Sequence, residues 1–201
     1  MEKKFVVTIT RQFGSLGRPI AREMSELLGI EYYDRDIVEE TSKQMKLPVS
    51  KISEHEEKYH SNLFSMILPL GSDNVTRQDE IFEVQKGIIR DLAARESCII
   101  VGRCADYIFR DNPNALNIYI YAPIEARYKN CVETLKMSPE EATKMIYKVD
   151  RARCSYHKRY AKYAPGDLDS KQIMIDSSIF GVDGTAEILA DIVRRRFGLE
   201  K

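Results

Sequence analysis

A loop that carries two glycines and two arginines is the first feature of the sequence that could do chemistry. It reads Arg11-Gln12-Phe13-Gly14-Ser15-Leu16-Gly17-Arg18 and follows an apolar, β-branched run, with apolar residues at helical spacing after it. Backbone N–H groups and a helix N-terminus can hold a phosphate at such a junction. Glycine lets the backbone approach an anion, and Arg11 or Arg18 could supply positive charge. The simpler interpretation is an ordinary strand-to-helix turn.

The loop differs from the phosphate-binding pattern G-x-x-x-x-G-K-[ST] at the positions that carry its side-chain chemistry. With Gly17 as the second glycine, Arg18 replaces the lysine, Pro19 replaces the magnesium-binding hydroxyl and Gln12 replaces the first glycine. Arg18 is then the nearest cation to the helix N-terminus, and we expect it to take over part of the role of the lysine. The sequence identifies no metal ligand in this loop.

Short apolar runs alternate with helical patterns along the whole chain, which indicates an α/β fold with a mainly parallel sheet. The length of 201 residues fits one domain with an inserted lid or flap. Helix-start signals are clear at Pro123 and at Ser138-Pro139-Glu140-Glu141, and Pro165-Gly166 ends the helix that begins at Ser138. The predicted strands are 5–10, 30–33, 98–101, 116–121 and 173–175.

Composition excludes several classes of protein. Lys and Arg together number 31, as do Asp and Glu, so no net charge attracts the chain to nucleic acid or to an anionic membrane. The four cysteines lack zinc-site spacing, and the apolar run after Lys4 is too short for a signal peptide or a membrane span. We therefore expect a cytoplasmic protein with reduced thiols, whose partners include neither nucleic acid nor membrane. The three histidines lack partners at ligand spacing, and we interpret them as surface residues.

A basic segment covers residues 144–162, in which Asp150 is the single acid. A charge run of this kind is often only a solvated helix face. A phosphoryl-transfer lid, however, needs guanidinium groups that spread charge over phosphate oxygens, and this favours Arg151 and Arg153 over the lysines around them. We predict both arginines as catalytic residues, together with Arg18.

An apolar cluster at residues 63–70 shows neither a strand period nor a helix period. We interpret it as a flap or as the contact of a homodimer. Residues 49–60 before it are charged, and we predict them to be helical.

Several spaced motifs together resemble the cytidylate kinase-like family. They are the loop from Ile9 to Arg18, Tyr33-Asp34-Arg35, the segment from Val101 to Tyr107, Asp150-Arg151-Ala152-Arg153, and Ile175-Asp176-Ser177-Ser178. The resemblance implies a three-layer fold of the P-loop kinase type with a five-stranded sheet, a helical lid at about 138–165 and an acceptor-binding or flap insertion at about 34–96. It also implies ATP as donor, Mg²⁺ as cofactor and a small phosphorylated acceptor.

The resemblance assigns roles by position. Gly14, Ser15, Leu16, Gly17 and Arg18 resemble the loop that binds the donor phosphates, and Asp34 follows the second strand where the acceptor-binding segment of such kinases begins. Arg103 ends the third strand at the carboxyl edge of the sheet, where open α/β sheets bind ligands. Arg127 lies in the first turn of a helix, where a cation opposes the helix dipole and suggests an anionic partner.

These assignments lead to a prediction and two alternatives. We predict a nucleotide-dependent phosphotransferase similar to nucleoside monophosphate kinases, with Asp34, Arg103 and Arg127 binding the acceptor. Glu40 lies near the position where a cytidylate kinase presents an arginine, so the identity of the acceptor stays open. One alternative is a regulatory module that binds nucleotide or phosphate without catalysis. The other, nucleic-acid binding through the basic helix, is disfavoured by the neutral net charge. The simpler interpretations of Asp34 and Arg103 are a solvated loop carboxylate and a surface arginine.

Overall fold

A computed structural model describes residues 4–46 and 72–199. The predicted helix at 49–60 and the apolar segment 63–70, with its proposed homodimer contact, lie outside the described residues. The same is true of the middle of the predicted insertion at 34–96.

Five parallel strands form one sheet in the order β2-β3-β1-β4-β5. The third strand has the predicted bounds, and the other four differ from prediction by one residue at one or both ends. All residues of this third strand are buried, as expected where helices cover both faces of a parallel sheet. The strands are β1 (Val6–Arg11), β2 (Glu31–Tyr33), β3 (Cys98–Val101), β4 (Ala115–Tyr121) and β5 (Ile173–Asp176).

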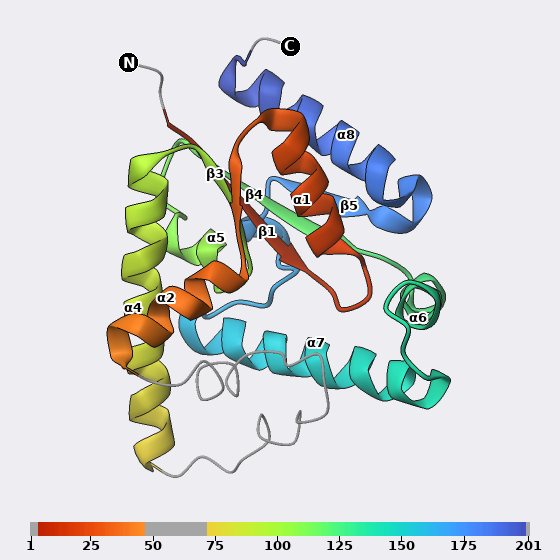
Figure 1. The fold of residues 1–201 in the computed structure, drawn as a ribbon, viewed down its shortest axis with the longest axis horizontal. Helices are drawn as coiled ribbons and strands as arrows, with labels where there is room; N and C mark the ends of the chain where they lie inside the picture. Colours follow the sequence, from red (N-terminus) through yellow and green to blue (C-terminus); the bar gives the residue numbers. More distant parts are fainter. Residues whose placement is uncertain (1–3, 47–71, 200–201) are drawn as a thin grey trace.

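Helices connect the strands and complete the α/β architecture that the sequence predicted (Figure 1). The short helix α5 was not predicted, because four residues are too few to show a helical period. The helices are α1 (Gly17–Leu28), α2 (Arg35–Met45), α4 (Ser72–Arg95), α5 (Ala105–Ile108), α6 (Ile124–Glu133), α7 (Pro139–Ala161) and α8 (Ser177–Phe197).

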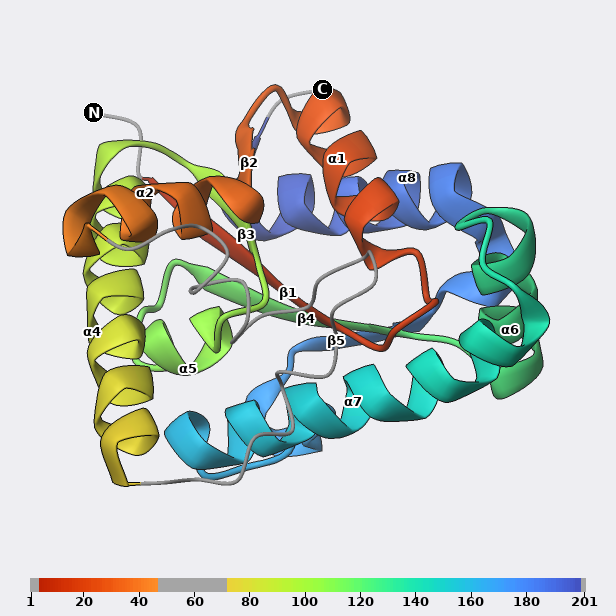
Figure 2. The same ribbon diagram turned by 60° about the horizontal axis from the view of Figure 1, so that its bottom comes forward.

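The sheet lies between two helical layers, each with its own apolar core. Ile20 of α1 and Leu189 of α8 are fully buried in one cluster with Val7 and Ile9 of β1. Figure 2 shows these two helices on the same side of the sheet. On the other face, residues of α2, α4 and α5 form a second cluster, which includes the fully buried Ile89. The two cores fix β1 in the centre of the sheet, and the loop after β1 is therefore held at its carboxyl edge.

The basic helix α7 begins and ends at identifiable residues. The hydroxyl of Ser138 accepts a hydrogen bond from the Glu141 N–H at 3.3 Å, and Pro139 is the first helical residue, which confirms the predicted cap. The helix ends at Ala161, before the predicted Pro165-Gly166 stop. Pro123 was predicted to be the first residue of α6. In the structure it lies at the N-cap, one position before the first helical residue. No helix of the described ranges is long and apolar enough to span a membrane.

Candidate functional site

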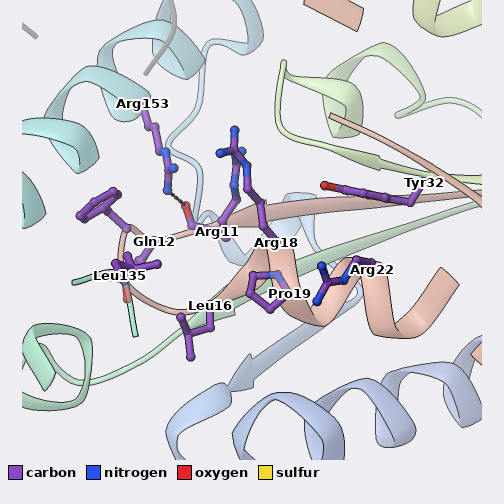
Figure 3. Close-up of a pocket in the computed structure, with 12 residues that line it drawn as sticks. Arg11, Gln12, Leu16, Arg18, Pro19, Arg22, Tyr32, Leu135 and Arg153 are labelled. Carbon is purple, nitrogen blue, oxygen red and sulfur yellow. Dashed lines mark hydrogen bonds between the residues drawn. The ribbon is translucent and has the colours of Figure 1, made fainter. Parts of the chain in front are cut away.

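A pocket of about 390 Å³ opens at the carboxyl end of β1, between the loop, α1 and α7. It is lined by residues 11–14 and 16–19, and also by Arg22, Tyr32, Leu135 and Arg153. Figure 3 shows Arg11 and Arg18 pointing to the same side of the loop, with Arg153 approaching from α7. The fold thus brings the predicted loop and one predicted lid arginine to one cavity.

Side chains from α6 and α7 hold the loop from behind. The Phe13 N–H donates to Asp150 Oδ1 at 2.7 Å, and Asn130 Nδ2 donates to the Gly14 carbonyl at 2.9 Å. Arg127 Nη1 lies 2.5 Å from Asp150 Oδ2 and also donates to the Phe13 carbonyl at 3.4 Å. Arg127, predicted to bind substrate, is therefore buried behind the loop and is not among the residues that line the pocket.

The Ser15 side chain faces the protein interior. Its hydroxyl lies 3.0 Å from the Gln12 carbonyl and 3.2 Å from the Ile120 carbonyl, both of which can accept its proton. The Ser15 carbonyl accepts a hydrogen bond from the hydroxyl of Ser177 at 2.8 Å. The sequence motif after β5 thus supports the loop, and Ser15 can serve a ligand only through its backbone.

A run of N–H groups in the loop has no acceptor within the part of the chain that the structure describes. Among the residues that the structure describes, the N–H groups of residues 14–18 donate to no other group. They lie at the N-terminus of α1, where unsatisfied N–H groups and the helix dipole favour an anion. The predicted donor-phosphate loop therefore has the backbone chemistry that binding a phosphate requires.

The two glycines of the loop are needed for packing. Gly14 has a φ of +78°, and a Cβ atom there would lie 2.8 Å from the carbonyl oxygen of Arg127. A Cβ atom at Gly17 would lie 2.8 Å from Cβ of Arg11. We had expected these glycines to let the loop approach an anion. In the structure they let it lie against α6 and against the stem of Arg11.

Asp34 is the anionic centre of a cluster of arginines. Its side chain is 2 % exposed and contacts Nε of Arg18. The other carboxylate oxygen lies 3.7 Å from Nη2 of Arg103 and 3.9 Å from Nη2 of Arg11. Burial would raise the pKa of Asp34, but the charges of Arg11, Arg18 and Arg103 together lower it. Asp34 is therefore an ionised carboxylate that holds three arginines, and the interpretation as a solvated loop residue was wrong.

Arg103 approaches Asp34 through the backbone as well. Its Nη2 and Nε donate to the Asp34 carbonyl at 3.0 and 3.3 Å, and its guanidinium side chain is only 10 % exposed. Arg103, two residues after the end of β3, is thus held against Asp34, and its interpretation as a surface arginine was wrong. Its predicted contact with an acceptor phosphate stays a prediction.

Positive charge is concentrated between β1 and α7. Arg153 Nη1 donates to the Arg11 carbonyl at 3.0 Å, and its guanidinium lies 5.9 Å from the centre of the Phe13 ring. Burial, and then the neighbouring charges of Arg11 and Arg18, lower the pKa of Arg153. Burial also lowers the pKa of Arg11 to about 10. A bound anion would relieve this crowding of like charges.

The sequence analysis placed Arg151 at the site and missed Arg22, and the structure shows the reverse. Arg151, predicted as catalytic with Arg153, is exposed on α7 and does not line the pocket. Arg22, which we did not single out, does line it. The spacing of Arg18 and Arg22 places both on one face of a helix, and this could have identified Arg22.

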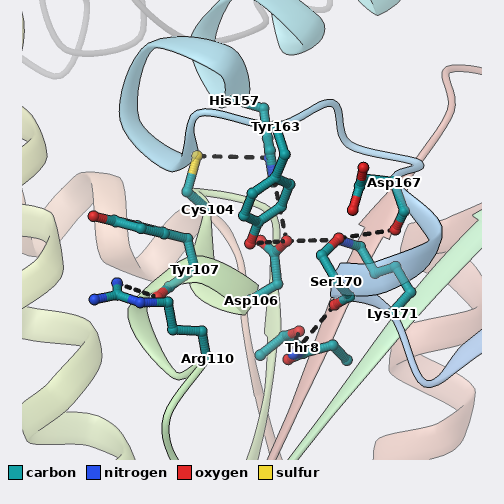
Figure 4. A network of polar contacts seen from close by, with 11 residues as sticks. Thr8, Cys104, Asp106, Tyr107, Arg110, His157, Tyr163, Asp167, Ser170 and Lys171 are labelled. Carbon is teal, nitrogen blue, oxygen red and sulfur yellow. Dashed lines mark hydrogen bonds and ion pairs between the residues drawn. The ribbon is translucent and has the colours of Figure 1, made fainter.

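A second polar cluster, whose residues do not line the pocket, joins α5, α7 and the segment before β5 (Figure 4). Asp106 Oδ2 lies 2.6 Å from Lys171 Nζ, 3.1 Å from His157 Nε2 and 3.1 Å from the Tyr163 hydroxyl. His157 Nδ1 lies 3.6 Å from the sulfur of Cys104. The interpretation of His157 as a surface residue was wrong, because Asp106 lies far away in sequence and only the fold brings the two together.

The residues around the pocket do not fit a directly bound Mg²⁺. Magnesium requires oxygen ligands at about 2.0–2.1 Å. The Ser15 hydroxyl points into the protein, Pro19 has none, and no carboxylate of the described residues lines the pocket. Asp34 is the adjacent carboxylate, and a cation on its oxygens would lie beside three guanidiniums. The predicted Mg²⁺ therefore finds no ligand set among the described residues at this pocket.

Comparison with known proteins assigns the chain to a family. The cytidylate kinase-like family matches residues 6–179, and the chain belongs to this family, as the sequence motifs predicted. A cytidylate kinase from Sulfolobus acidocaldarius is 22% identical over 188 residues, which cover 91% of each chain.

Solved structures with the same fold include known kinases. A crystal structure of an uncharacterized protein from Eubacterium ventriosum is 24% identical, with a TM-score of 0.72 over 94% of this chain and 98% of that one. Shikimate kinase from Acinetobacter baumannii, in complex with shikimate, is 11% identical, with a TM-score of 0.55 over 96% of this chain and 95% of that one. At these identities the similarity shows a P-loop kinase fold, as predicted.

Proposed function

We propose that this member of the cytidylate kinase-like family transfers the γ-phosphoryl group of ATP to a small phosphorylated acceptor such as a nucleoside monophosphate. The observation that carries the proposal is the pocket at which four arginines gather beside a loop whose N–H groups, at residues 14–18, have no acceptor among the described residues. The family membership supports kinase chemistry in general.

The donor phosphates would lie against the loop and the arginines. The N–H groups at the start of α1 would bind phosphate oxygens, and Arg11, Arg18 and Arg153 would neutralise their charge. In the transfer, an acceptor oxygen forms a bond to the γ-phosphorus while the bond from that phosphorus to the β–γ bridging oxygen breaks. Charge that spreads over the equatorial oxygens would be stabilised by guanidiniums already in place, so catalysis is mainly positioning and electrostatics.

The state of Asp34 favours an acceptor that is itself a phosphate. A hydroxyl acceptor needs a general base, and the ideal base has a pKa near the working pH. The pKa of Asp34 is lowered instead, and three arginines hold its carboxylate. A phosphate acceptor is mostly ionised at neutral pH and needs no base. Arg103, fixed beside Asp34, is the residue we propose to bind it.

One observation favours the alternative of a module that binds nucleotide without catalysis. The loop offers neither a lysine nor a free hydroxyl, since Pro19 follows Arg18 and the Ser15 hydroxyl is engaged with backbone carbonyls. The two proposals agree on phosphate binding and differ only in turnover.

ADP formation separates the two proposals. The protein is incubated with ATP and each nucleoside monophosphate in turn, once with Mg²⁺ and once with EDTA, and ADP is measured with the wild type and with Arg103→Ala. We expect one acceptor to give turnover, with a KM that rises in Arg103→Ala while kcat changes less. Arg90→Ala, which removes an exposed arginine of α4 away from the pocket, is the matched control. ATP binding without ADP formation for any acceptor would establish the non-catalytic alternative.

A further inference from the structure

The described lining of the pocket has many hydrogen-bond donors for an anion and few oxygen ligands for a metal. Its lining contains four guanidinium groups, from Arg11, Arg18, Arg22 and Arg153, together with most of the loop whose N–H groups are unused. Among the residues that the structure describes, the oxygen-bearing side chains of the lining are Gln12 and Tyr32. Gln12 Oε1 already accepts a hydrogen bond from the Ala122 N–H at 3.2 Å. The donor groups therefore outnumber the available oxygen ligands by a wide margin.

The charges around the pocket also favour an anion over a cation. Asp34 is the anion that offsets these arginines, and it lies between Arg18 on one side and Arg11 and Arg103 on the other. A divalent cation entering this region would be repelled by the guanidiniums, whereas each further negative charge on a ligand would be attracted. Desolvation strengthens both effects, because Arg11 and Arg153 are partly buried.

We propose that this pocket binds the phosphate chain of its nucleotide as the metal-free polyanion, with the arginines supplying the charge that Mg²⁺ supplies in other P-loop kinases. The inference rests on the proposed function for the identity of the ligand, but its chemistry requires only a polyphosphate. Mg²⁺ on the phosphates cancels two negative charges and occupies oxygens that would otherwise accept guanidinium hydrogens. Magnesium therefore weakens binding at this pocket.

Pyrophosphate is the probe, because it lacks a base and reports the phosphate subsite alone. Its affinity is measured by calorimetry in EDTA and then in excess MgCl₂, at matched ionic strength and pH. We expect pyrophosphate to bind in EDTA and to bind about tenfold more weakly, or worse, when Mg²⁺ saturates it, because one lost charge-assisted hydrogen bond has an effect of that size. Affinity that is higher with Mg²⁺, or equal in the two conditions, would overturn the inference.

Arg22→Gln locates the binding at the pocket. Arg22 is exposed on α1, so its replacement leaves the buried contacts of the fold intact, and it removes one of the four cations. We expect the affinity for pyrophosphate in EDTA to fall about tenfold and the weakening by Mg²⁺ to become smaller. Arg90→Gln, the same change on the exposed face of α4, should alter neither quantity. Equal effects of the two variants would show that the anion binds elsewhere and would overturn the inference.

The outcomes also separate this inference from the proposed function. Pyrophosphate that binds only with Mg²⁺ overturns the inference and leaves the donor site in place. Metal-free binding without ADP formation supports the inference and removes only the catalytic part of the proposed function. Absence of pyrophosphate binding in both conditions overturns both.

Discussion

Arg153 donates a hydrogen bond from Nη1 to the carbonyl oxygen of Arg11 at 3.0 Å, and this contact joins the basic helix α7 to the carboxyl end of the central strand. The contact holds the Arg153 guanidinium at the pocket while its charge lies beside Arg11 and Arg18. Arg151, two residues earlier on the same helix, is exposed and outside the pocket. The two arginines therefore form a natural pair for experiment.

The first prediction compares Arg153→Ala with Arg151→Ala. We expect Arg153→Ala to lower kcat by about 10²-fold or more, because it removes a preorganised donor from the transferring group. Arg151→Ala should stay within about twofold of the wild type, as a solvated surface charge does. Steady-state kinetics with ATP and whichever nucleoside monophosphate supports turnover measures both. Similar losses in the two variants would restore Arg151 to the catalytic role that the sequence suggested.

Most of the fold could be predicted from the sequence, because apolar period and turn residues are local properties. The strand Cys98–Val101 has its predicted bounds, and the cap of α7 at Ser138 is confirmed. Contacts between distant segments could not be predicted. The pairing of Arg127 with Asp150 depends on how α6 packs against α7, and a sequence shows only that each residue is charged.

In the candidate site, too, local features could be predicted from the sequence and contacts between distant segments could not. The loop was identifiable by its position after the first strand, and Arg18 by its place at the start of the helix. That Asp34 would be shared by three arginines follows from the strand order, which sets the ends of β1, β2 and β3 side by side. The sequence alone does not specify that order.

The second prediction concerns Arg18, which lies at the N-terminus of α1 with its Nε against Asp34. Arg18→Ala should weaken ATP binding about 10-fold to 150-fold, since one charge-assisted contact contributes roughly 1.5–3 kcal/mol. Arg18→Lys should restore part of the affinity, because it returns the charge but not the planar fork. Calorimetry measures the ATP affinity of the wild type and of each variant. Unchanged affinity in a folded Arg18→Ala protein would transfer the role to Arg11 or Arg153.

The third prediction is a pH dependence of stability that depends on Asp34. Its pKa is lowered in the folded protein, since the charges of three arginines outweigh the effect of burial. A carboxylate of this kind stabilises the fold fully above its unfolded pKa of about 3.9, and the contribution is lost as the pH falls through the folded pKa. Asp34→Asn should therefore lower the free energy of unfolding by about 3–5 kcal/mol at pH 7. The difference from the wild type should shrink below about pH 4.

Urea denaturation at several pH values measures this difference. Asp36→Asn, two residues away at an exposed position, is the control and should be within about 0.5 kcal/mol of the wild type. A difference between wild type and Asp34→Asn that stays constant from pH 7 to pH 3 would mean that the contacts of Asp34 do not depend on its charge. The arginine cluster would then need another anionic centre.

The fourth prediction concerns the buried pair of Lys171 and Asp106, whose side chains are both 0 % exposed and 2.6 Å apart. Lys171→Met removes one partner and leaves a buried carboxylate with only Tyr163 and His157 beside it. Breaking a buried pair in this way costs about 3–5 kcal/mol of the free energy of unfolding. The double variant Lys171→Met with Asp106→Asn should recover part of that loss, because no uncompensated charge remains.

The matched control is Lys86→Met, which breaks the pair between Lys86 and Glu83 on the surface of α4, where Glu83 is 62% exposed. We expect a loss of at most about 0.5 kcal/mol there, because solvent screens an exposed pair three residues apart on a helix. Urea denaturation at neutral pH compares the three variants. If Lys171→Met were no more destabilising than Lys86→Met, water would have to reach Asp106. The cluster would then not anchor the end of α7, and Arg153, one helical turn before His157, would depend on its own contacts, which include the one with Arg11.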